Sequence, residues 1–122
     1  TLILTNVRFD DQILCDAYSA ANLFVLPSLY ETFGVVVLEA WASSSPVICG
    51  NVGGLPSFVK DGENGVFSDI NNANALSESI KEVLYNPQLN NKLHQNSLKA
   101  VHQYSWQSIT TQLSKIYEAV TP

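Results

Sequence analysis

The sequence has little charge and few of the residues that build covalent or metal-bound scaffolds. Only 14% of the 122 residues are charged and the formal net charge is -5, whereas a nucleic-acid surface needs a clustered excess of Lys and Arg. Cys15 and Cys49 form no CxxC motif and have no histidine nearby, which argues against a metal site or a disulfide framework. We interpret both as free thiols in a reducing compartment. No apolar run approaches the ~20 residues of a membrane-spanning helix.

Methionine is also absent, and the chain begins in the apolar run TLILT. We expect this start to lie inside a larger protein. The hydrophobic content of 46% is ordinary for a globular protein, and the length fits one domain. The prediction is therefore a single domain over 1–122, cut from a longer chain.

Four short apolar runs are bounded by turn residues, and they lie at 1–5, 23–27, 46–50 and 65–67. The first three are nearly continuous rather than alternating, which is typical of strands covered on both faces. Parallel neighbours need a crossover helix, and the intervening stretches are long enough for one. The pattern predicts an α/β fold, a Rossmann-like parallel sheet with flanking helices.

Helices are predicted in the intervening and C-terminal stretches. The first, over 10–21, has an apolar face and begins at Asp10 or Asp11 as its cap. The stretch YETFGVVVLEA contains three valines that favour a strand, but a helix over 34–43 keeps strand and helix alternating, so we predict a buried helix there. Three more are expected at 73–85, at 88–101 after Pro87, and at 106–119.

The loop between the second run and this buried helix is the candidate site. Ligands of open α/β sheets bind beyond the carboxyl ends of the strands, and the free N–H groups of a helix N-terminus attract anions. Glu31 lies in the loop, Gly34 allows a close backbone approach, and Glu39 lies one turn into the helix. Gly53 and Gly54 follow the next run and are placed at the same cleft. The alternative is that both glutamates are ordinary surface charges.

The order of motifs resembles a known family. Residues 23–67 contain P-S, E-x7-E with an internal F-G, E-A, P-V, G-G-x-P and D-G-x-x-G in series, and the likeness extends to the S-W at 105–106. This series is similar to the C-terminal nucleotide-sugar-binding domain of GT-B glycosyltransferases, glycosyltransferase family 4 (group 1). The resemblance implies transfer of a glycosyl unit from a nucleotide-diphospho-sugar to an acceptor with retention of configuration.

The resemblance also implies roles for individual residues. Glu31 would contact the donor sugar near the reacting carbon as the catalytic residue, and Glu39 would bind the ribose. Backbone N–H groups of Thr32, Phe33 and Gly34 would donate to the sugar hydroxyls and the diphosphate. Val35 would lie beside these three residues. No cofactor and no metal are expected.

Partners and place in the cell follow from the same resemblance. The expected partners are the donor and a missing N-terminal acceptor domain of the same protein, without nucleic acid and without a transmembrane segment. The expected location is cytoplasmic, with peripheral membrane contact possible in the full-length enzyme. This piece alone would be inactive, because the Arg and Lys that usually grip the diphosphate would lie upstream of Thr1.

Several positions depart from the family pattern or carry charges near it. Ser57 replaces a frequent Glu, and Ser45 stands near a usual Gly. Arg8 and Lys60 are interpreted as surface charges. His94 and His102 are expected to be solvated rather than catalytic. The alternatives left open are a non-catalytic interaction module of the same fold, which Ser57 favours, and a nucleotide-sugar epimerase.

The first apolar run also raises a question of pairing. In the doubly wound strand order, two absent strands would lie between 1–5 and 23–27 of the intact domain. We expect 1–5 to pair beside 23–27 within the chain, giving four parallel strands in sequence order. The alternative is a dimer that fills the gap with a second chain.

Overall fold

The sheet at the centre of the molecule is parallel. The structure is a computed structural model that describes residues 3, 5–8 and 10–120. Among these residues the sheet has three strands in the order β1-β2-β3, with the bounds Phe24–Leu26, Val47–Cys49 and Val66–Phe67. The α/β class and the parallel sheet predicted from the apolar runs are confirmed.

The five predicted helices are all present. Their bounds are Gln12–Ala20 for α1, Val35–Ala42 for α2, Ala73–Tyr85 for α3, Pro87–Val101 for α4 and Trp106–Val120 for α5, with short 3-10 turns at Leu55–Ser57 (η1) and His102–Tyr104 (η2). Asparagine caps begin two of them. The side chain of Asn72 accepts hydrogen bonds from the N–H groups of Asn74 and Ala75, and that of Asn86 accepts one from Leu89.

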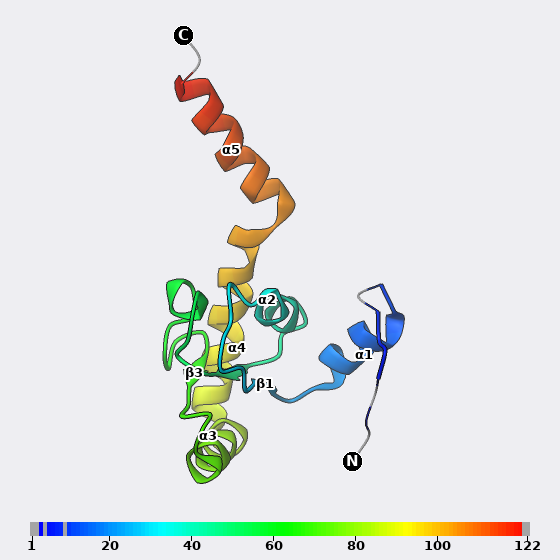
Figure 1. Cartoon of the computed structure of the whole chain (residues 1–122), viewed down its shortest axis with the longest axis vertical. Helices are drawn as coiled ribbons and strands as arrows, with labels where there is room; N and C mark the ends of the chain where they lie inside the picture. Colours follow the sequence, from blue (N-terminus) through cyan, green and yellow to red (C-terminus); the bar gives the residue numbers. More distant parts are fainter. Residues whose placement is uncertain (1–2, 4, 9, 121–122) are drawn as a thin grey trace.

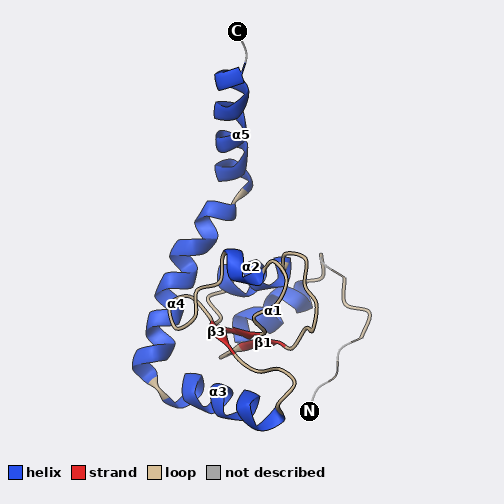
Figure 2. Cartoon of the chain, turned by 60° about the vertical axis from the view of Figure 1, so that its left-hand side comes forward, coloured by secondary structure: helices blue, strands red, loops and turns tan. Residues whose placement is uncertain are grey.

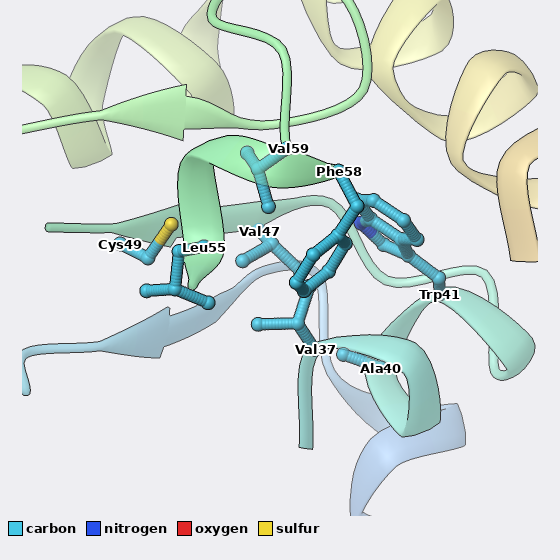
Figure 3. Close-up of a cluster of buried hydrophobic side chains, with 8 residues drawn as sticks. All are labelled: Val37, Ala40, Trp41, Val47, Cys49, Leu55, Phe58 and Val59. Carbon is cyan, nitrogen blue, oxygen red and sulfur yellow. The ribbon is translucent and has the colours of Figure 1, made fainter. Parts of the chain in front are cut away.

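Helices cover both faces of the sheet, as Figure 2 shows. Val47 and Cys49 point from β2 into a cluster built with Val37, Ala40 and Trp41 of α2 (Figure 3). Between them along the strand, Ile48 points to the opposite face, where it packs with Val83 of α3 and Leu93 of α4. Since side chains alternate along a strand, a strand apolar at every position must be covered on both sides.

The first and last helices contribute no buried residue to this core, although Tyr18 of α1 packs against its edge. Neither α1 nor α5 has a buried residue, and α5 extends away from the body of the molecule (Figure 1). Asp11 takes the cap position of α1, but its side chain makes no capping bond and instead accepts a hydrogen bond from the N–H of Arg8 at 2.8 Å. The predicted cap is therefore correct in position and wrong in its bond.

The predicted fourth strand is not formed by the described residues. Ile3 and Thr5, the described part of 1–5, belong to no strand, and Ile3 is 78% exposed. Thr1, Leu2 and Leu4 lie outside the described residues. Apolar residues join a sheet only where neighbouring elements cover them, and Ile3 is not covered, so apolar character alone was an insufficient signal. The pairing of sheet edges between two chains stays a prediction.

Candidate functional site

Two loops meet at the carboxyl end of the sheet. One runs from β1 to α2 and contains Glu31, and the other runs from β2 to η1 and contains Gly53 and Gly54. Leu26 and Cys49, the last residues of the two strands, lie opposite each other. The N–H of Gly54 donates a hydrogen bond of 3.1 Å to the carbonyl oxygen of Glu31. The two loops that sequence analysis assigned to one cleft are therefore in direct contact.

The paired glycines make this contact possible. A Cβ at Gly53 would overlap the carbonyl oxygen of Glu31, and a Cβ at Gly54 would overlap that of Thr32. Gly53 also has a φ of +55°, which a residue with a side chain rarely adopts. The glycines thus shape the loop that carries Glu31 by packing beneath its backbone.

Gly34 begins the helix that follows this loop. It is buried, has a φ of +91°, and its carbonyl accepts a hydrogen bond from Val37 at 2.9 Å. A Cβ there would lie 2.6 Å from Cδ2 of Leu55, so the turn needs glycine for space as well as for conformation. Because the first N–H groups of a helix have no partner within it, this end of α2 presents backbone donors.

Phe33 anchors the loop through its side chain. Its ring stacks on Phe58 at 4.9 Å between centroids and lies 6.0 Å from the ring of Tyr104. Sequence analysis expected only a backbone contact from this residue, and the η2 turn that supplies Tyr104 was not foreseen. By contrast, Thr32 is exposed, and Val35 is 58% exposed at the surface of the first helical turn.

The two glutamates have different surroundings. Glu31 is half-buried, and its carboxylate has no hydrogen-bond or ion-pair partner among the described residues. Glu39 is also half-buried and accepts a hydrogen bond of 3.0 Å from the hydroxyl of Tyr18 on α1. Burial, together with this hydrogen bond and the charge of Glu39, raises the pKa of Tyr18 to about 12. Sequence analysis placed Tyr18 only within the predicted helix over 10–21 and gave it no part in the site.

A cavity of about 210 Å³ lies beside Glu39, between α1 and α2. It is lined by Leu14, Cys15, Tyr18, Glu39, Ala42 and Ser43. A larger cavity of about 720 Å³ lies near the amino ends of the strands, around Pro46 and the junction of α3 and α4. We place the site at the carboxyl end in spite of this size difference, because ligands of open α/β sheets bind there.

The two basic side chains considered in the sequence are surface charges, whereas one of the two histidines makes a contact within the fold. Arg8 forms an exposed ion pair of 3.0 Å with Asp10, and exposed Lys60 contacts the carbonyl oxygen of Pro56 at 3.4 Å, so both are surface charges as predicted. His102 is exposed, but the prediction of a solvated His94 is wrong. His94 is half-buried, and its Nδ1 donates a hydrogen bond of 2.8 Å to the carbonyl oxygen of Ser44. Its spacing on α4 gave no sign of this contact with the end of α2.

The described residues form neither a cluster of metal ligands nor a helix that could cross a membrane. Across residues 3, 5–8 and 10–120, no three His, Cys, Asp or Glu side chains come together as a metal site. None of the helices described above is both long and apolar enough to cross a membrane.

Comparison with known proteins identifies the family. The model of the family described as glycosyl transferases group 1 matches residues 7–100, which include both loops and both glutamates. The chain belongs to the group 1 glycosyltransferases. The resemblance inferred from the order of motifs is thereby confirmed, and the family number 4 stays a prediction.

Individual proteins that are similar to this chain support the family assignment. D-inositol 3-phosphate glycosyltransferase of Corynebacterium efficiens is 32% identical over an alignment of 119 residues, and the alignment covers 94% of this chain and 28% of that protein. The structure of sucrose-phosphate synthase from Thermosynechococcus elongatus is similar with a TM-score of 0.78 and 38% identity, over 88% of this chain and 27% of that one. The chain thus spans about a quarter of the length of these two proteins.

A third similarity concerns an isolated domain. The C-terminal domain of the group 1 glycosyl transferase LpcC from Francisella tularensis has a TM-score of 0.70 and 27% identity, over 80% of this chain and 50% of that one. The fold is therefore that of part of a GT-B C-terminal domain, as the sequence predicted.

Proposed function

We propose that the protein containing this chain transfers a glycosyl unit from a nucleotide-diphospho-sugar to an acceptor with retention of configuration. The observation that carries the proposal is the contact between the two loops at the carboxyl end of the sheet. There the loop of Glu31 lies against Gly54 and leads directly into the N-terminus of α2. Carboxylates beside free backbone donors suit a ligand that combines sugar hydroxyls with a diphosphate.

Each group has a role in this scheme. Glu31 faces the donor sugar near the reacting carbon and stabilises positive charge that develops there, since its carboxylate has no partner among the described residues. Backbone N–H groups of residues 32–34 meet the sugar hydroxyls and the diphosphate, with Val35 beside them. Glu39 accepts hydrogen bonds from the ribose, and Gly53 and Gly54 hold the loop against the ligand.

In our proposal, the helix dipole of α2 balances the negative charge that develops on the departing diphosphate. The N-terminus of α2 carries partial positive charge, which favours the leaving group as it becomes more negative. An acceptor hydroxyl attacks the anomeric carbon on the same face from which the diphosphate departs, and its proton passes to the leaving phosphate oxygen. We propose that this transfer proceeds without a metal, assisted by basic side chains from outside this chain.

The rest of the protein supplies the other requirements. We propose an N-terminal domain that holds the acceptor, a cytoplasmic location, and no activity of residues 1–122 alone. The proposal of a further domain is supported by coverage, because this chain corresponds to 28% of the D-inositol 3-phosphate glycosyltransferase and 27% of the sucrose-phosphate synthase chain quoted above.

Hydrolysis of nucleotide-sugar donors by the full-length protein tests the proposal. Glu31→Gln should reduce kcat more than it raises KM, because the lost charge matters most when the glycosyl carbon becomes cationic. Glu63→Gln, an exposed glutamate in a turn, is the control. If the unmodified protein neither hydrolyses nor binds donors, the interaction module becomes the better description. A change in KM alone would reduce Glu31 to a binding residue.

A further inference from the structure

The side chains of Tyr18 and Ser45 join the end of α1 to α2 and to the connection that follows it. The hydroxyl of Tyr18 donates to Oε2 of Glu39 at 3.0 Å across 21 positions of sequence. The hydroxyl of Ser45, in turn, lies 2.9 Å from the backbone carbonyl oxygen of Tyr18 and 3.2 Å from that of Ala21. One serine thus contacts the final turn of α1, and one tyrosine extends from that turn to the site.

Tyr18 is a fixed and permanent donor. Its ring packs against that of Phe24 on β1, with 5.4 Å between centroids and an interplanar angle of 53°. The raised pKa of about 12 keeps its phenol protonated throughout the neutral range. The phenol is therefore protonated at neutral pH and able to donate to Glu39.

Ser45 fixes the helix on which Tyr18 stands. The residue is 1% exposed, at the connection between α2 and β2, while α1 has no buried residue of its own. A helix without buried side chains depends on a few specific contacts for its place. The last carbonyl groups of a helix have no partner within it. The single proton of the Ser45 hydroxyl lies within reach of the carbonyl oxygens of Tyr18 and Ala21, and the Tyr18 carbonyl also accepts a hydrogen bond from the N–H of Ala21. Sequence analysis placed Ser45 near a position where the family usually has glycine, and the neighbouring Ser44 has the positive φ of +64° that glycine favours.

Glu39 has room to adopt other orientations. The cavity of about 210 Å³ beside it means that packing alone does not hold its side chain. Its carboxylate has no other hydrogen-bond partner among the described residues. The hydrogen bond from Tyr18 therefore sets the orientation of the Glu39 carboxylate.

We propose that Tyr18 is a positioning residue that aims the Glu39 carboxylate at the ribose of the donor, and that Ser45 holds Tyr18 in place. This inference rests on the proposed function, in which Glu39 binds the ribose. With Oε2 held by Tyr18, Oε1 is the oxygen that accepts the ribose hydroxyl. Loss of the phenol would leave the carboxylate present but disordered, and ribose recognition would weaken without loss of the fold.

The test uses the full-length protein that contains this chain. Calorimetric titration with UDP, GDP and ADP identifies the nucleotide that the unmodified protein binds most tightly. Tyr18→Phe keeps the ring and removes only the hydroxyl. It should raise the Kd of that nucleotide about two- to tenfold, the range expected for the loss of one hydrogen bond. With the 2′,3′-dideoxy form of the same nucleotide, Tyr18→Phe should leave the Kd unchanged.

The matched control is Tyr85→Phe, because Tyr85 is 81% exposed and its hydroxyl has no partner among the described residues. It should change neither Kd. A merely structural role of Tyr18 would instead lower the melting temperature and weaken both forms of the nucleotide equally, and that result would overturn the inference. An unchanged Kd for the ribose form would overturn it as well. If the unmodified protein binds none of the three nucleotides, the proposed function fails first.

Ser45 gives a second, independent measurement. Ser45→Ala and Ser45→Gly should each weaken the ribose form selectively, by less than Tyr18→Phe does. The double variant Tyr18→Phe/Ser45→Ala should bind no more weakly than Tyr18→Phe alone, because both residues act through one carboxylate. Strictly additive losses would show that Ser45 acts by another route and would overturn its part of the inference.

Discussion

At the residue scale, Glu39 is the carboxylate whose surroundings are best defined. It lies one turn into α2 and accepts a hydrogen bond from Tyr18. Glu39→Ala in the full-length protein should weaken donor binding by one or two charge-assisted hydrogen bonds, roughly 1.5–3 kcal/mol each. Titration calorimetry with the donor measures this loss, and Glu82→Ala on the exposed face of α3 is the control. An unchanged donor Kd would remove Glu39 from the site.

The two cysteines should differ in reactivity. Cys15 is exposed on α1, whereas Cys49 is 0% exposed and its pKa is raised to about 12 by burial and, less, by the charge of Asp61. A thiol-specific chromogenic reagent at pH 8 should therefore titrate one thiol per folded chain and two in guanidinium. The raised pKa means that the protonated Cys49 stabilises the fold below pH about 9, and that this contribution is lost as the pH rises toward 12. Two fast thiols in the folded chain would contradict this account.

The sequence indicated which two loops meet, but not the side-chain contacts around them. Glu31, Gly53 and Gly54 were assigned to one cleft from their places after strands, and the loops do touch. The link from Tyr18 to Glu39 could not be predicted, because it joins positions 21 residues apart on two helices whose relative rotation no local pattern fixes. The same reason explains why the contact of His94 with Ser44 was missed.

At the scale of elements, the glycine pair offers a direct test of the loop contact. Gly54 has an ordinary φ of -81°, so Gly54→Ala adds no backbone strain but forces its Cβ into the carbonyl oxygen of Thr32. We expect a loss of about 2 kcal/mol or more in unfolding free energy, comparable to other overpacked sites, together with weaker donor binding. Denaturant unfolding and calorimetry measure the two effects.

Gly62→Ala is the matched control for that substitution. Its Cβ would meet nothing within 4 Å, but its φ of +66° adds strain of about 1 kcal/mol. Donor binding should be unchanged in this variant. If Gly62→Ala costs more stability than Gly54→Ala, the loop packing beneath residues 31–33 contributes less than the geometry indicates.

Elements with a strong local signal were predicted closely. The helix at 73–85 has the predicted bounds because an Asn cap precedes it and an Asn-Pro pair ends it. The valines at 35–37 illustrate the opposite case, since their intrinsic preference is for strand and the fold places them in α2. There the alternation of strand and helix was the better guide. The run at 1–5 failed because it had apolar residues but no such context.

At the scale of the whole molecule, side-chain burial is greatest around the sheet and least in α5, and we expect local stability to follow the same order. Strand β2 is buried at all three positions, whereas α5 buries none of its residues and its apolar stripe is exposed, with Leu113 at 46% and Ile116 at 59%. The sequence predicted the helix over 106–119, but the periodic apolar residues of a helix do not say what covers them. Isolated helices of this length are marginal in water, so α5 should open far more often than the core.

Hydrogen exchange of the chain tests this gradient, and α4 is the internal comparison. Both α4 and α5 have 15 residues, but α4 buries Leu93 and Ser97 and packs against α2 and α3. If tertiary packing rather than helix propensity sets the protection, amides in the middle of α4 should exchange about a hundredfold more slowly than those of α5. Protection of α5 that equals that of α4 and rises with protein concentration would mean that a second copy covers the stripe. Equal protection independent of concentration would mean that helix propensity alone stabilises α5, contrary to the packing seen here.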